Sequence, residues 1–117
     1  MALSRLASEF AAEINNHDWS DAPYRRDRAG HNRSRDPKAP PEPLSARQTD
    51  YVQTNVMWVV AQVLGYEDPN FDPCEFAEAC GVDMVSNHSL SKASILAGLR
   101  IDNGRYATPG TWDHMPG

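Results

Sequence analysis

The sequence predicts a mainly α fold: a small helical domain of about four helices, with a short C-terminal β-hairpin and an extended arm rich in proline and arginine. Three observations predict it. Apolar residues recur at helical spacing in separate segments, helix-start signals stand at Ser45 and Asp72, and Asn103-Gly104 marks a tight turn. The expected parts are an N-terminal amphipathic helix in residues 1–19, the arm or a linker in residues 20–43, and a helical domain with the hairpin in residues 44–117.

The first element is an amphipathic helix that ends near Asn16. Its apolar side carries Leu3, Leu6, Phe10 and Ile14 at spacings of three or four residues, with Ala7 and Ala11 filling the same side. A helix of about 12 residues is marginal in isolation, so we expect this side to dock on the rest of the chain or on a partner.

The segment 20–43 lacks an apolar period and ends in a run of prolines, Pro37, Pro40, Pro41 and Pro43. We expect an extended path with no core of its own, acting as a linker or as an arm that wraps a partner. Its candidate partner-binding residues form the basic cluster of the chain: Arg25, Arg26, Arg28, Arg33, Arg35 and Lys38. Such a cluster could bind a phosphate backbone or an acidic protein surface, or it could shield acidic residues of its own chain.

The central helix is predicted to begin at Ser45, because Ser45 and Gln48 form a capping box. Valines and leucines follow on more than one face, and Gly65 supplies a residue that can end the helix. A strand over residues 56–64 is the alternative that the valines allow.

A short helix over Pro73–Cys80 follows, with Asp72 as its cap and Gly81 as its end. A fourth helix over about residues 90–99 is weakened by Gly98. The pair Asn103-Gly104 then predicts a hairpin, because both residues tolerate the positive φ of a type I′ turn.

The chain ends with another predicted turn, Thr108-Pro109-Gly110-Thr111. After it we expect Trp112 to fold back on the body of the domain.

The charge of the chain is unevenly distributed. Residues 1–43 carry seven basic and seven acidic residues, whereas residues 44–117 carry four and nine, which together give the net charge of −5. An acidic domain is a poor candidate for binding nucleic acid through phosphates. With two cysteines at a spacing unsuited to a disulfide, Cys74 and Cys80, and no apolar leader or span, the sequence favours a soluble protein of the reducing cytoplasm.

Residues 73–106 resemble a winged helix-turn-helix, in which the small Ala77 lets two helices approach and Gly81 opens the turn before Val82. The resemblance implies a DNA-binding regulator of transcription or recombination. Its DNA-binding residues would be Asn87, His88, Ser89, Ser91, Lys92 and Arg105. The sequence departs from that family at Asn87, where an apolar core residue is usual.

Catalytic and metal-binding motifs are weak in this sequence. A metal site would need His17, His31, Cys74, Cys80 and His88 to converge, and no nucleophile elbow or glycine-rich phosphate loop is present. We therefore predict a non-enzymatic protein without cofactor or metal.

The segment 16–33 (NHDWSDAPYRRDRAGHNR) resembles short accessory proteins encoded by phages of actinobacteria. That resemblance implies an accessory protein of the host cytoplasm that binds a host or phage protein. The arm also allows binding to a second copy of the chain, the winged-helix resemblance makes DNA the alternative partner, and no membrane is expected.

Overall fold

The computed structural model describes residues 3–82 and 91–112. Within these ranges the chain forms four α-helices, two 3-10 turns and one two-stranded antiparallel hairpin, so the predicted mainly α fold class is confirmed. The elements in chain order are α1 (Arg5–Asn16), η1 (Trp19–Asp21), η2 (Arg33–Arg35), α2 (Ala46–Glu67), α3 (Pro73–Ala79), α4 (Lys92–Ala97), β1 (Ile101–Asp102) and β2 (Arg105–Tyr106).

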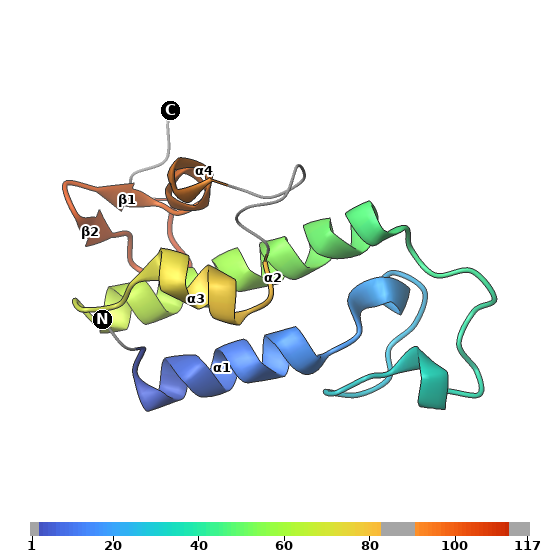
Figure 1. Cartoon of the computed structure of the whole chain (residues 1–117). Coiled ribbons are helices and arrows are strands. Elements are labelled where there is room, and N and C mark those ends of the chain that lie inside the picture. The colour runs from blue at the N-terminus through green and yellow to red at the C-terminus, as the bar shows by residue number, and fades with distance from the viewer. Residues whose placement is uncertain (1–2, 83–90, 113–117) are drawn as a thin grey trace.

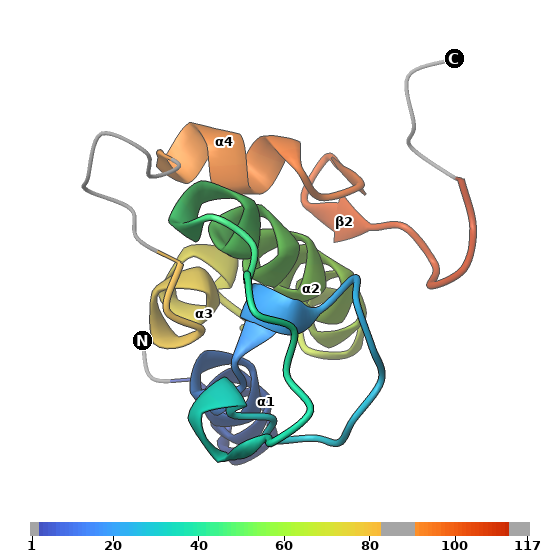
Figure 2. The same cartoon turned by 90° about the vertical axis from the view of Figure 1, so that its right-hand side faces the viewer.

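The helices pack in a stack around α2 and α3. Helices α1 and α2 run in opposite directions, and α3 contacts both of them (Figure 1). Seen from the right-hand side, α4 lies above α2 and α3, and α1 lies below them (Figure 2). The middle of the molecule is therefore covered from two sides, which is how short helices remove their apolar faces from water.

The core is centred on Met57 of α2 and Phe76 of α3, which are both fully buried. Burying one such side chain contributes about 1.5–3 kcal/mol. The other core residues come from every helix: Ala7, Ala11, Ile14, Ala61, Leu64, Ala77, Cys80, Val82, Ile95 and Leu99.

Helix α1 docks through the alanines of its predicted apolar side rather than through Leu6 and Phe10. Ala7 and Ala11 are each 1% exposed, whereas Leu6 and Phe10 are 58% and 42% exposed. Small alanine side chains allow the backbone of α1 to approach α2 and α3 closely, which a stripe of leucine and phenylalanine would prevent. Ile14 is buried as predicted.

Helix α2 begins with the predicted capping box, in which the Gln48 amide donates to Ser45 Oγ at 3.1 Å and the Ser45 amide donates to Gln48 Oε1 at 3.0 Å. The strand alternative over residues 56–64 is wrong, because those residues are helical. Gly65 does not end the helix, which continues to Glu67. Instead, Gly65 lies directly under the ring of Tyr106, where a Cβ atom would collide with it.

Helix α3 has the predicted N-terminal cap, Asp72, whose Oδ1 accepts from the amides of Cys74 and Glu75. Gly81 has a φ of +86°, which explains why a glycine follows this helix. The predicted fourth helix is present as α4, and it ends before Gly98.

The predicted hairpin is confirmed, with Ile101 opposite Tyr106. Asn103 and Gly104 have φ values of 53° and 76°, as a type I′ turn requires. The prediction that Trp112 folds back on the domain is wrong, because its side chain is 79% exposed.

Candidate functional site

Residues 17–44 fold into a closed loop, although the sequence predicts an extended arm with no buried residues of its own. The Asp18 amide donates to the His31 carbonyl at 2.9 Å, and the Leu44 amide donates to the Ser20 carbonyl at 2.7 Å. Asp21 and His31 are 2% and 4% exposed. The arm therefore has a small polar core, which corrects the expectation from the sequence.

Short-range side-chain contacts explain why this segment turns back on itself. Asp18 accepts from the Ser20 amide at the start of η1, and Asn32 accepts from the Ser34 amide at the start of η2. Between them, Gly30 adopts a φ of +80°, and its amide donates to Nδ1 of His17 at 3.1 Å. These local signals lie in the sequence but do not show what the loop encloses.

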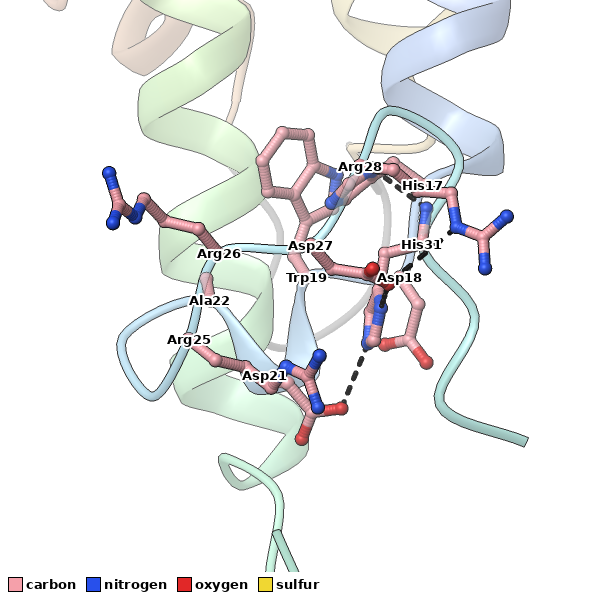
Figure 3. A pocket seen from close by; sticks show the side chains of 10 residues that line it. All are labelled: His17, Asp18, Trp19, Asp21, Ala22, Arg25, Arg26, Asp27, Arg28 and His31. Atoms are coloured by element: carbon pink, nitrogen blue, oxygen red, sulfur yellow. Dashed lines mark hydrogen bonds and ion pairs between the residues drawn. The ribbon is translucent and has the colours of Figure 1, made fainter. Parts of the chain in front are cut away.

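The loop encloses the imidazole of His31. Its Nδ1 lies 2.7 Å from Oδ2 of Asp27, and its Nε2 lies 3.0 Å from Oδ2 of Asp21. Figure 3 shows the ring held between these carboxylates. Hydrogen bonds to Asp27 and Asp21 raise the pKa of His31, and the bond to His31 in turn lowers the pKa of Asp27.

Two arginines continue this network from the same segment. Arg33 donates to Oδ1 of Asp21 at 2.8 Å and to the carbonyl of Pro40 at 2.5 Å. Arg25 donates to Oδ1 of Asp36 at 3.1 Å. We call the group Asp21, Asp27, His31, Arg33, Arg25 and Asp36 the His31 cluster.

A cavity of about 180 Å³ opens beside the His31 cluster. Its wall carries two more arginines, Arg26 and Arg28, and the ring of His17. The pKa of His17 is lowered by burial and by the neighbouring His31. The cavity thus combines carboxylates, guanidinium groups and imidazoles, a set that suits small charged ligands.

The structure divides the six basic residues predicted to bind a partner. Arg25 and Arg33 are half-buried in the His31 cluster, and Arg28 approaches Asp27 at 3.8 Å from the solvent side. Arg26, Arg35 and Lys38 are exposed and form no ion pair with any residue that the structure describes. The sequence signal for this division is the alternation of aspartates with the arginines between residues 21 and 36.

Three of the residues predicted to contact DNA are described, at the start of α4 and on the hairpin, and these elements lie at the other end of the molecule from the arm (Figure 1). Ser91 caps α4 by accepting from the Ser94 amide at 3.1 Å. Lys92 and Arg105 are exposed. Asn87, His88 and Ser89 lie outside the described residues.

The cysteines and histidines weighed as a metal site do not converge where the structure describes them. Cys80 is buried in the core, where burial raises the pKa of its thiol to about 12. His17 and His31 are neighbours in the loop, with ring centroids 6.0 Å apart. His88 again lies outside the described residues.

A second hollow, of about 240 Å³, lies between α2 and the segments around Gly98 and Pro109. We call it the α2–α4 groove, and it is lined by Trp58, Val59, Gln62, Val63, Gly98, Arg100, Pro109 and Gly110. Val59 is 70% exposed and Val63 is 42% exposed, although both stand in the middle of a helix. Nothing in the sequence pattern separates these two valines from the buried residues of α2, so the groove was not predicted.

No described helix has the length and apolarity needed to cross a bilayer. In comparisons with known proteins, no family model, no curated protein and no solved structure matches this chain.

Proposed function

We propose that this chain is a non-enzymatic binding module that takes a segment of a partner protein in the α2–α4 groove. The observation that carries the proposal is the pair of exposed valines, Val59 and Val63, on the wall of a hollow rather than on a flat surface. Apolar side chains that line a concave surface gain free energy when a partner removes them from water.

The groove is held in shape before any partner arrives. Gln62 accepts from the Arg100 amide at 2.9 Å and donates to the Arg100 carbonyl at 3.2 Å. Trp58 donates from Nε1 to the Ile95 carbonyl at 2.9 Å. Such bonds fix the wall formed by α2 against the wall formed by the end of α4, which reduces the entropy lost on binding.

The side chain of Arg100 indicates the chemistry of the partner. Its Nε is buried and has no hydrogen-bond partner among the described residues. Arg100 lines the groove, and a carboxylate of a partner would pair with its guanidinium group and balance the charge. We therefore expect a protein segment that places a large apolar side chain beside an aspartate or glutamate.

The arm adds little at the groove itself, because it lies at the opposite end of the molecule from the hairpin (Figure 1). Its exposed cations Arg26, Arg35 and Lys38 instead form a separate basic surface that attracts acidic partners over about 8–10 Å at physiological salt. A phage accessory protein that binds a host or phage protein is compatible with such a surface.

A random peptide library displayed on yeast tests the proposal. We expect enriched peptides to pair an aromatic or aliphatic residue with Asp or Glu. Their affinity should fall at least about tenfold on Val59→Glu, equivalent to about 1.4 kcal/mol. Leu6→Glu is the matched control, because Leu6 is 58% exposed on α1, outside the groove.

Two results would contradict this proposal. One is a failure to enrich any peptide, or enrichment of peptides that bind the Val59→Glu variant equally well. The other is a wild-type dimer in sedimentation that Val59→Glu converts to a monomer, because a second copy would then occupy the groove.

An Arg100→Gln variant should lose the preference for Asp or Glu over Asn or Gln in the peptide.

DNA binding is the competing proposal, and one observation favours it: Lys92 in the first turn of α4 and Arg105 on the hairpin are both exposed cations. The basic residues of the arm lie at the opposite end of the molecule from this hairpin (Figure 1), so they add little to phosphate contacts at α4. A mobility-shift series at low salt tests it. Binding that Lys92→Ala and Arg105→Ala both weaken would favour DNA, and no shift would exclude it.

A further inference from the structure

We propose that Asp27, His31 and Asp36 form a binding site for a divalent transition-metal cation such as Zn²⁺. One oxygen of each carboxylate and one nitrogen of the imidazole lie within 4.8 Å of one another. The sequence offers His31 as a ligand only together with cysteines and other histidines, but its neighbours in the structure include the aspartates Asp21, Asp27 and Asp36.

The distances between donor atoms fit one shared ion. His31 Nδ1 lies 2.7 Å from Oδ2 of Asp27 and 3.9 Å from Oδ2 of Asp36. Two ligands of a tetrahedral zinc ion, each about 2.0–2.1 Å from the metal, are about 3.3 Å apart. The observed separations lie on either side of this value, so small side-chain rotations would place a cation between the donors.

Asp36 gives an independent indication of a missing ligand. Its side chain is only 8% exposed, and its Oδ2 accepts no hydrogen bond from any described residue. The NH1 group of Arg25 is 3.0 Å from this oxygen, but it directs its hydrogen bond to Oδ1 of the same carboxylate. The charge of Arg25 offsets part of the cost of burying this oxygen, and a cation on the side facing His31 would supply the partner that the oxygen lacks.

The surroundings of His31 match those of a metal-binding histidine. Such a residue usually donates its second ring N–H to a carboxylate, which fixes the ring and the tautomer. Asp21 occupies this position at 3.0 Å from Nε2, and Arg33 holds Asp21 in turn. With Nε2 bound to Asp21, Nδ1 is the nitrogen that faces Asp27 and Asp36.

The donor set favours a transition metal over Mg²⁺ or Ca²⁺. Imidazole nitrogen suits Zn²⁺, Co²⁺ or Ni²⁺, whereas the alkaline-earth ions prefer oxygen ligands alone. The neighbouring cavity of about 180 Å³, whose wall includes Asp27 and His31, gives an entry path. Three protein ligands also leave at least one coordination position for water or for a group from another molecule.

Titration of the metal-free 117-residue chain with Co²⁺ and with Zn²⁺ tests the proposal. We expect one Co²⁺ per chain, with an intensified visible absorption band that Zn²⁺ abolishes and Mg²⁺ does not. Asp27→Asn and Asp36→Asn should each weaken Co²⁺ binding more than tenfold. Asp21→Asn should weaken it about 10–100-fold through the orientation of the ring.

Glu42→Gln is the matched control, because Glu42 is an exposed carboxylate in the same segment outside the His31 cluster. It should bind Co²⁺ like the wild type. Circular dichroism identifies any variant that fails to fold, and Asp27, whose side chain is 22% exposed, provides the milder substitution. A Co²⁺ spectrum identical to that of the free aqueous ion, or unchanged affinity in folded Asp27→Asn, would overturn the proposal.

Discussion

Asp21 and His31 lie ten residues apart in the sequence, yet Oδ2 of Asp21 is 3.0 Å from Nε2 of His31 and both side chains are almost fully buried. This contact turns a segment rich in arginine and proline into a folded part of the domain. Within the folded segment, Arg25 and Arg33 form ion pairs with aspartates of the same segment, so fewer of its cations are available to a partner.

Removal of the His31 side chain should open the arm without unfolding the helices. His31→Ala leaves the buried carboxylate of Asp21 without its imidazole partner, which costs about 1–3 kcal/mol. Limited proteolysis with trypsin should then cut after Arg33, which is half-buried in the wild type. As the control, Arg26→Ala changes an exposed side chain and should leave the cleavage rate at Arg33 unchanged. Equal cleavage rates in the wild type and in His31→Ala would contradict the role of the Asp21–His31 contact.

The close packing of Tyr106 on Gly65 gives a second prediction. Gly65→Ala places a methyl group inside the volume of the Tyr106 ring, and overpacking of this kind costs about 1–3 kcal/mol. Because alanine favours a helix more than glycine does, the same change should become neutral or stabilising in a Tyr106→Ala background. Urea unfolding of the four proteins in this cycle measures the coupling, and additive effects would show that the ring does not contact Gly65.

Alkaline pH should weaken the fold through Tyr106. Burial raises the pKa of this phenol to about 12. Since the folded pKa lies above the unfolded value of about 10, the stabilisation is complete below pH 10 and is lost as the pH rises toward 12. Urea unfolding at about pH 8 and about pH 11 should show a smaller alkaline loss for Tyr106→Phe than for the wild type.

The same experiment includes a second group that titrates at alkaline pH. Burial also raises the pKa of Cys80 to about 12, so some alkaline loss should remain in Tyr106→Phe. Equal losses in both proteins would contradict the burial of the Tyr106 hydroxyl.

The face of α1 that docks on the core can be tested by changing the side-chain size at two neighbouring positions, Ala7 and Leu6. Ala7→Leu should cost about 1–3 kcal/mol, because Ala7 is 1% exposed against the core. Leu6→Ser should change the free energy of unfolding by no more than about 0.5 kcal/mol, apart from a small effect of helix propensity. A larger loss of stability from Leu6→Ser than from Ala7→Leu would show instead that Leu6 and Phe10 form the buried face.

Local signals in the sequence account for most of the fold. The capping box at Ser45 and Gln48, the cap at Asp72 and the Asn103-Gly104 turn each depend on residues a few positions apart, so their geometry follows from the sequence. The end of α2 does not follow in this way. Gly65 lies inside the helix, and its lack of a side chain makes room for Tyr106, which is far along the chain.

The candidate sites were harder to predict because each depends on tertiary contacts. Basic and acidic residues alternate in the arm, but only the loop closure at Asp18 and His31 brings Asp27 and Asp36 to one imidazole. The exposure of Val59 in the α2–α4 groove likewise depends on where α4 and the hairpin pack. Periodicity within α2 carries no such information.

Hydrogen exchange at individual amides is the most direct test of the folded arm. The amides of Asp18 and Leu44 donate to the carbonyls of His31 and Ser20, so we predict that both exchange far more slowly than an unstructured chain and that His31→Ala removes this protection. Exchange of both amides at the rate of an unstructured chain in the wild type would contradict the closed loop and, with it, the His31 cluster.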